Sequence, residues 1–325
     1  MKINLIYLSE NRHGGWVTYT RHLYSALTLH GCDVRLVKLR ASSSSTLRDF
    51  GYGLKYASLS PTDIVRMQGY SIIVAIQKNY AGVAGDILRH DRSCSVVLHD
   101  KDELKHLEWV DVSGRCVVIR KVNAKLVDGS TYIPHPYIPW SFKPIKKTIH
   151  ARSICRIDFD KNTDILLGAN RLLPSNRKID VRGFENRLYT KFKLMRQFPE
   201  WVQSVNDFPR TQSAAVDLLM PARFAVDMSV IKGDGGGTQY SFLEAIDAGA
   251  CCVIHDEWCV VKGEMKPGVN CLTAGGAESL AKVLKSTPLS KAEELANSAK
   301  SILRAHRSSV VAPQYIELMR GLYER

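Results

Sequence analysis

Residues 232–254 read KGDGGGTQYSFLEAIDAGACCVI, a glycine-rich loop followed by a helical pattern and then a short apolar run. Glycine loses more backbone entropy on folding than any other residue, so the run 235–237 indicates close approach of a ligand or a conformation that other residues avoid. A continuous apolar run such as 250–254 is typical of a buried strand in a parallel sheet. A loop, a helix and a buried strand in this order predict an α/β fold.

The same alternation of short apolar runs and helical patterns extends through the 325 residues on both sides of this stretch. In the first half, strands are expected at 3–8, 33–39, 71–76, 94–100 and 116–120. A helix is expected between the first two strands, ending at Gly31, and the polar run 41–53 is expected to be a loop. In the second half, strands are expected at 153–157, 178–183, 224–231 and 250–256. Helices are expected near 162–173, around Glu244 and from about 289 to 325.

Residues 133–152 divide the chain, because four prolines in this segment prevent a helix or a central strand from continuing through it. A single core seldom grows beyond about 250–300 residues, so two domains are expected. We predict two α/β domains that meet within this segment, at 1–146 and 147–304.

The composition argues against a membrane or secreted protein and favours anionic partners. No run of about 18 apolar residues is present, so no membrane span is expected. The start reads as a first strand rather than a signal peptide. The eight cysteines lack a metal or disulfide spacing, which favours a reduced, cytoplasmic protein. A net charge of +13 favours nucleic acid, an anionic membrane surface or phosphorylated ligands as partners, although it also serves solubility.

Three places carry candidate site residues. Gly14 and Gly15 precede the first helix, where free backbone amides suit a phosphate or sugar oxygen or form only a turn. His99 and Asp100 follow a strand, where they would handle a proton or lie on the surface. Arg156 and Lys161 suit a diphosphate, a pairing that chance also produces.

The opening stretch adds a loop of backbone amides and an acid. Its candidate ligand-binding residues are Asp234, Gly236, Gly237, Thr238, Gln239 and Glu244. The loop amides would point at a phosphate, and the Glu244 carboxylate would accept the two ribose hydroxyls. The alternative for Glu244 is a solvent-facing acid on the helix.

Five segments in order resemble the retaining GT-B glycosyltransferases with a C-terminal E-x7-E motif. They are HGGWVTYTRHLYSALTLHGCDVRLV (13–37), YIPHPYIPWSFKP (132–144), ICRIDFDKN (154–162), SFLEAIDAGACCVI (241–254) and GVNCLTAGGAESLAKVL (268–284). The resemblance covers almost the whole chain. It implies a GT-B fold of two Rossmann-like domains whose parallel sheets face each other across a cleft. The N-terminal acceptor domain at 1–146 would be completed by the C-terminal helix at 305–325, which packs back on it, and the C-terminal nucleotide-sugar domain would span 147–304.

The resemblance also implies roles for single residues. Arg156 and Lys161 would bind the donor diphosphate, Glu244 the ribose, and Gly15 the donor phosphate or sugar, with His99 near the transferred sugar. The implied donor is a nucleotide sugar, most simply a UDP-sugar such as UDP-glucose, and no metal is obligatory. One departure is clear: the first glutamate of the motif is replaced by Gly236. Asp234 or the glycine amides would take over its contacts with the sugar.

The acceptor is addressed by a shorter resemblance. VVLHDKDELK (96–105) and YSFLEAIDAGACCVIHDEW (240–258) are similar to segments of the T-even phage DNA alpha-glucosyltransferases, which glucosylate hydroxymethylcytosine in duplex DNA. Candidate DNA contacts are the cations Lys143, Lys146, Lys147, Arg177, Lys178, Arg182 and Arg187. A bacteriophage-type DNA modification enzyme is therefore the leading hypothesis. The alternatives are a glycan or lipid acceptor and a non-catalytic nucleic-acid binder.

Overall fold

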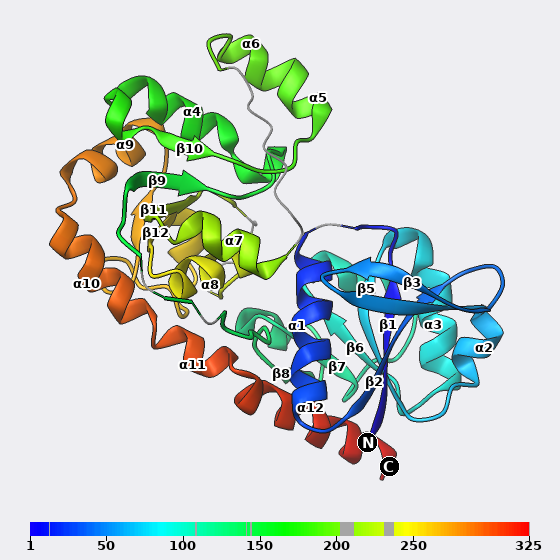
Figure 1. Ribbon diagram of the computed structural model, residues 1–325. Helices are drawn as coiled ribbons and strands as arrows, with labels where there is room; N and C mark the ends of the chain where they lie inside the picture. The colour runs from blue at the N-terminus through cyan, green and yellow to red at the C-terminus, as the bar shows by residue number, and fades with distance from the viewer. Residues whose placement is uncertain are drawn as a thin grey trace. The chain divides into compact units, whose positions relative to one another are not determined.

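The computed structural model describes residues 1–12, 14–107, 109–140, 142–143, 145–201, 211–230 and 237–324. The chain folds as two compact units (Figure 1). Unit 1 consists of Met1–Ile138 together with Arg304–Arg325, and unit 2 consists of Pro139–Leu303. Each unit is an α/β layer structure with its own sheet.

The sheet of unit 1 has eight strands in the order β3-β4-β2-β1-β5-β6-β7-β8. The strands are β1 (Lys2–Leu8), β2 (Asp33–Leu39), β3 (Ser44–Gly51), β4 (Leu54–Leu59), β5 (Tyr70–Ile76), β6 (Ser95–Leu98), β7 (Cys116–Val118) and β8 (Thr131–Tyr132). All neighbours pair in parallel except β3 and β4. The five strands predicted in this half are present, and the parallel α/β class is confirmed.

Residues 41–53 were expected to be a loop, and that prediction is wrong. They contain most of an antiparallel hairpin, in which β3 pairs with β4 through a turn at Tyr52 and Gly53, both with positive φ. The strand β3 lies at the edge of the sheet and is largely exposed, so its serines give no alternation of apolar and polar residues. Its composition therefore resembles that of a loop and does not reveal the hairpin with β4.

Helices α1 (Gly15–Leu29), α2 (Pro61–Val65) and α3 (Ala81–His90) connect these strands, and short 3-10 turns follow β5, β6 and β7. Buried side chains of β1, β5, β6 and β7 form one apolar core with α2 and α3. This core includes Ile6, Ile73, Val96 and Val118. The parallel arrangement places the carboxyl ends of all these strands at one edge.

The C-terminal segment belongs to unit 1. Helix α12 (Ser308–Tyr323) packs on α1, and its Tyr315 hydroxyl is hydrogen-bonded to the Tyr19 hydroxyl in the buried interface. Just before α12, the backbone oxygen of His306 accepts from the Tyr137 amide at 2.7 Å, and its Nδ1 donates to the His135 oxygen. The expectation that the C-terminal helix returns to the N-terminal domain is confirmed.

The sheet of unit 2 has five parallel strands in the order β10-β9-β11-β12-β13. They are β9 (Ile149–Ser153), β10 (Ile179–Val181), β11 (Ala222–Asp227), β12 (Cys251–His255) and β13 (Leu272–Ala274). The strand expected at 153–157 lies earlier, because the polar residues Arg152 and Ser153 are buried within the sheet and so hide the strand from the sequence pattern, while Arg156 belongs to the following loop.

The helices of unit 2 are α4 (Thr163–Leu172), α7 (Gln212–Leu219), α8 (Tyr240–Asp247), α9 (Ala277–Ser286), α10 (Leu289–Ala299) and α11 (Ile302–His306), which continues into unit 1. The short helices α5 (Arg187–Tyr189) and α6 (Met195–Gln197) are joined by one π-helical segment (Thr190–Leu194) and stand apart from the sheet in Figure 1. Buried residues of β9, β11 and β12 form the core with α4, α9 and α10.

All eight cysteines are free, and six of them are buried. Among the described residues, no helix is both long and apolar enough to cross a membrane.

Candidate donor site

Two loops meet at the carboxyl edge of the unit 2 sheet, where ligands bind in open α/β folds. Strand β9 is followed by residues 154–162, which lead into α4, and β11 is followed by residues 228–230. The Asn162 side chain donates to the Met228 backbone oxygen at 2.9 Å, and the Val230 amide donates to the Asp160 oxygen at 3.3 Å. The two loops are therefore held together as one surface.

Asp227, the last residue of β11, is the centre of this surface. Its side chain is buried and accepts hydrogen bonds from the Ser229 amide (2.9 Å), the Gln239 side chain (2.8 Å) and the hydroxyls of Ser229 and Ser241. A carboxylate is an acceptor with about four lone-pair sites, which these donors occupy. One acid thus joins the end of β11 to the start of α8.

The charge of Asp227 is stabilised by its surroundings. Burial acts to raise its pKa, but the Lys161 charge and the hydrogen bonds from the two serines outweigh burial and lower the pKa below its ordinary value. A buried charge of this kind is tolerated only when it is paired and hydrogen-bonded. Asp227 is accordingly ionised at neutral pH.

Lys161 and Arg156 reach the same surface from the β9 loop. The Lys161 ammonium donates to the Ser229 hydroxyl at 3.0 Å and lies 3.5 Å from Asp160. The Arg156 guanidinium, whose side chain is 47% exposed, forms ion pairs with Asp158 at 3.1 Å and Asp160 at 3.2 Å. The predicted diphosphate cations are therefore brought together, each already paired with an acid.

Helix α8 points its N-terminus at this surface through Gln239. Gln239 is the N-cap residue in extended conformation, and its side chain reaches Asp227 instead of capping the helix. No acid lies in the first turn of α8, so its backbone amides keep their partial positive charge. Such an end is a general site for anions.

The glycine loop is described only at its C-terminal end. The Gly237 backbone oxygen accepts from the buried Trp258 indole at 2.6 Å, and Thr238 is buried beside it. The predicted residues Asp234 and Gly236 lie outside the described residues. Glu244 lies in the second turn of α8 and is half-buried. Gln239 thus binds Asp227 directly and Lys161 reaches it through Ser229, while Glu244 lies about one turn further along α8.

In unit 1, the glycine pair precedes α1 as expected. Gly14 is the N-cap residue, with φ 94° and ψ −173°, a combination that is available essentially to glycine alone. Gly15 is the first helical residue, and a Cβ at either position would have no heavy atom within 4 Å. The backbone conformation at Gly14 therefore requires glycine, whereas at Gly15 there is room for a side chain.

His99 is buried rather than exposed at the end of β6. Its Nε2 donates to the Val74 backbone oxygen at 2.9 Å, and its ring packs edge-on against Tyr19. Burial lowers the pKa of His99 to about 4 against the opposing effect of the Val74 hydrogen bond. The imidazole is therefore neutral at pH 7.

Asp100 caps the 3-10 turn Lys101–His106, accepting from the amides of Asp102 and Glu103. Sequence reasoning missed Glu103, which is buried and accepts from the Trp16 indole at 2.8 Å and the His99 amide at 2.7 Å. Burial, followed by the neighbouring Asp100 charge, raises the pKa of Glu103 well above its ordinary value. The sequence offers only a weak signal for Glu103, an acid four residues after His99. The 3-10 turn has neither helical nor strand periodicity, so the pattern does not show that this acid is buried.

The predicted acceptor cations are distributed over unit 2. Lys143, Lys146, Lys178 and Arg187 are exposed, while Arg182 pairs with Asp180 at 3.0 Å. The Lys147 ammonium donates to the Ala248 oxygen at the C-terminal end of α8, and burial lowers its pKa to about 8. Arg177 donates to the Lys285 oxygen at 2.8 Å. The roles of all these site residues stay predictions.

In the described part of the chain, no three His, Cys, Asp or Glu residues are grouped to hold a metal ion. No family model matches the sequence, and no curated protein matches it at a significant level.

Solved structures do match the fold. Anabaena HepE in complex with UDP-glucose superposes with a TM-score of 0.73 at 14% identity, over 99% of this chain and 100% of that chain. The phage T4 alpha-glucosyltransferase in complex with UDP-glucose and DNA containing an abasic site gives a TM-score of 0.69 at 14% identity, over 98% and 99%. The same enzyme with UDP and a 13-mer DNA containing a HMU base gives 0.68. The chain therefore has the two-unit GT-B fold, and its structural neighbours are glycosyltransferases.

Proposed function

We propose that the protein is a retaining glycosyltransferase that moves a sugar from a UDP-sugar to a hydroxyl, with hydroxymethylated bases in duplex DNA as the leading acceptor. The proposal is carried by one observation. At the carboxyl edge of the unit 2 sheet, the α8 N-cap residue Gln239 binds the buried Asp227, Lys161 reaches it through Ser229, and Arg156 joins Lys161 at Asp160. The neighbours of the same fold are complexes with UDP or UDP-glucose.

The charges of the surface define how a diphosphate would bind. Arg156 is exposed and holds Asp158 and Asp160 through ion pairs at 3.1 and 3.2 Å, which are weak when solvated. A diphosphate offers the guanidinium two oxygens in the geometry of a carboxylate and replaces these partners. Lys161, at 14% exposure, stays on Ser229 and balances Asp227. The α8 amides supply the remaining positive partial charge.

In the proposed transfer, the bond between the sugar C1 and the phosphate oxygen breaks while the acceptor oxygen bonds to C1 on the same face. The diphosphate leaves with the electron pair and takes up the acceptor proton. Arg156 and the α8 amides stabilise the charge that develops on the leaving oxygen, which is the largest source of rate in such sites. His99 has a pKa of about 4 and donates through Nε2 to Val74, so it suits a hydrogen bond to the sugar better than proton transfer.

DNA is favoured as the acceptor by charge. The chain carries a net charge of +13, and its segment 177–196 holds seven Lys or Arg residues and two acids. Cations that neutralise phosphates supply most of the non-specific affinity for DNA. One neighbour of the fold is in complex with DNA. An enzyme on duplex DNA would reach the base hydroxyl by flipping the base out of the stack.

The test measures nucleoside diphosphate release from UDP-, GDP- and ADP-sugars, with and without duplex DNA that carries hydroxymethylated pyrimidines. Mass spectrometry of the digested nucleosides then identifies any added sugar. We expect UDP release that depends on the modified DNA, with a hexose mass on one base. Release that ignores DNA rejects the DNA acceptor and points to a glycan or lipid. DNA binding without release from any donor rejects the transferase.

Two matched variants test the donor site. Arg156→Gln removes hydrogen bonds to a charged group, each worth about 1.5–3 kcal/mol, so we expect kcat/KM to fall roughly 10- to 150-fold. Arg304→Gln, which removes the same charge from an exposed position of unit 1, is the control. Equal kcat/KM for wild type and Arg156→Gln would remove Arg156 from the donor site.

A further inference from the structure

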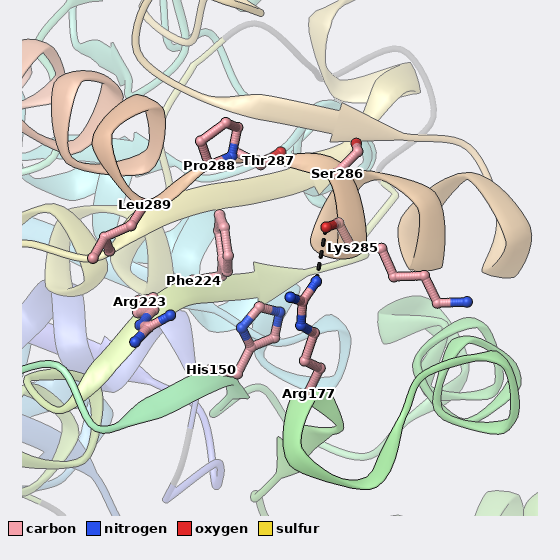
Figure 2. Close-up of a pocket in the computed structure, with 9 residues that line it drawn as sticks. All are labelled: His150, Arg177, Arg223, Phe224, Lys285, Ser286, Thr287, Pro288 and Leu289. Carbon is pink, nitrogen blue, oxygen red and sulfur yellow. Dashed lines mark hydrogen bonds between the residues drawn. The ribbon is translucent and has the colours of Figure 1, made fainter.

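A second, cationic pocket lies at the opposite edge of the unit 2 sheet (Figure 2). His150 stands at the start of β9, and Arg223 and Phe224 stand at the start of β11, so the pocket faces the amino ends of strands whose carboxyl ends carry Asp227. The other side is closed by residues 285–289, which comprise the end of α9, the connection 287–288 and the first residue of α10. The cavity has a volume of about 200 Å³. It is distinct from the candidate donor site.

The lining of the pocket is positive. Its residues are His150, Arg177, Arg223, Phe224, Lys285, Ser286, Thr287, Pro288 and Leu289. Of these nine described residues, none is acidic. Figure 2 shows the guanidinium groups of Arg177 and Arg223 on either side of the His150 ring, whereas the Lys285 side chain points away. Two guanidinium groups flanking one ring form the kind of site that holds an anion with several oxygens.

One of the two guanidinium groups is fixed in place. Arg177 donates through one terminal nitrogen to the Lys285 backbone oxygen at 2.8 Å, which orients the rest of the group over the pocket. A guanidinium has five N–H donors, so this bond uses a small part of its capacity. Orientation before binding reduces the entropy that a ligand loses on arrival.

The start of α10 adds a third positive feature. Pro288 is the N-cap residue and Leu289 the first helical residue, and both line the pocket. Within the described chain, no side chain caps this end and no acid lies in the first turn. The amides of the first turn of an 11-residue helix therefore contribute partial positive charge at the pocket mouth.

The pKa of His150 reflects the charges around the pocket. Its Nε2 is hydrogen-bonded to the Leu284 oxygen at 3.1 Å, and its ring lies edge-on to Phe224. Burial lowers the pKa of His150, the Leu284 hydrogen bond opposes this, and the charges of Arg177 and Arg223 lower the pKa further. A pocket whose cations disfavour an additional positive charge favours a negative one.

We propose that this pocket binds a phosphoryl group, held by the Arg177 and Arg223 guanidinium groups and the first-turn amides of α10. A volume of about 200 Å³ is below the roughly 300–1,000 Å³ of pockets for drug-sized ligands, so it suits a phosphate with a few waters better than a whole nucleotide sugar. The phosphoryl group belongs either to free phosphate or to a DNA backbone. The proposal is independent of the glycosyl transfer proposed above.

Imidazole NMR signals of the full-length protein test the proposal, with His150 assigned by the loss of its signal in His150→Gln. Inorganic phosphate is titrated at constant ionic strength, with chloride as the balancing anion. We expect a saturable shift of the His150 signal and an apparent Kd that rises about tenfold in Arg177→Gln and in Arg223→Gln. A His150 signal that does not move up to on the order of ten millimolar phosphate overturns the proposal.

Arg156→Gln is the matched control, because it removes the same charge at the other edge of the same sheet. We expect it to leave the His150 response unchanged, and an equal loss in this variant overturns the proposal. Amide fingerprints check that each variant is folded, and either pocket variant suffices for the test. Duplex DNA that displaces phosphate at His150 identifies the backbone as the source, whereas DNA without effect there identifies free phosphate.

Discussion

The side chain of Asp227 is expected to be the most sensitive position at the candidate donor site. In Asp227→Asn the volume hardly changes, but the charge that balances Lys161 is lost. The new amide group also presents two N–H donors where the Gln239 and Ser241 side chains already donate. The substitution therefore removes the attraction to Lys161 and turns at least one hydrogen bond into a repulsive contact between two donors.

The magnitude follows from burial. Asp227 is 5% exposed and accepts four hydrogen bonds, so no water replaces the lost contacts. Leaving a buried hydrogen-bonding group without its partner costs about 1–3 kcal/mol, and we expect unit 2 to lose at least this amount of stability at pH 7. Because the folded-state pKa is lowered, this contribution is complete above the unfolded value near 3.8 and is lost as the pH falls through the folded pKa.

Native-state hydrogen exchange of the β11 amides measures the effect within unit 2 and needs no two-state assumption for the whole chain. Asp217→Asn is the control, because Asp217 is exposed on α7 in the same unit. Protection in β11 that changes by less than about 0.5 kcal/mol in Asp227→Asn would show that the carboxylate does not hold the two loops together.

Three predictions concern unit 1. Gly14→Ala should lower the stability of α1 by about 1–3 kcal/mol because of its positive φ, whereas Gly15→Ala should not; equal exchange protection in both variants would contradict this. Turnover should show no inflection from His99 between pH 5 and 8, since its pKa is about 4; an inflection that disappears in His99→Gln would refute it. Tyr315→Phe should cost about 1–3 kcal/mol in thermal unfolding through the lost bond to Tyr19, and an unchanged melting temperature would exclude that bond.

The sequence predicted the parallel strands of the fold because buried strands are continuous apolar runs, as in Ile3–Leu8 and Cys251–Ile254. It failed for β3, which is an exposed edge strand, and for 153–157, where an apolar run belongs to a loop. Both failures share a cause: local composition reports burial, and burial does not specify pairing. Cys94, Cys116, Cys251 and Cys252 are buried, as their apolar neighbours in the sequence imply, whereas Cys155 lies in the loop after β9 and is half-buried.

Only part of the candidate site was predicted, for a similar reason: the sequence indicated Lys161 and Gln239 but not the acid at the centre of the site. Lys161 and Gln239 are 78 positions apart, and only the fold brings Gln239 onto the Asp227 carboxylate and Lys161 onto the neighbouring Ser229 hydroxyl. Asp227 itself ends an apolar run, FAVD, which is a detectable signal: an acid at the carboxyl end of a buried strand lies at the ligand edge of the sheet. Its partners could not be known, since hydrogen bonds between loops depend on topology.

The distribution of charged residues shows which parts of the chain account for the net charge of +13. At the candidate donor site, the cations Arg156 and Lys161 face three acids, Asp158, Asp160 and Asp227, so this surface contributes no excess positive charge. The excess lies elsewhere, in the segment 177–196 and in the pocket lined by Arg177 and Arg223. A donor diphosphate therefore does not account for the basic composition. If a polyanionic acceptor does, transfer to DNA should fall steeply with salt, because each neutralised phosphate releases counterions, while UDP binding should change little.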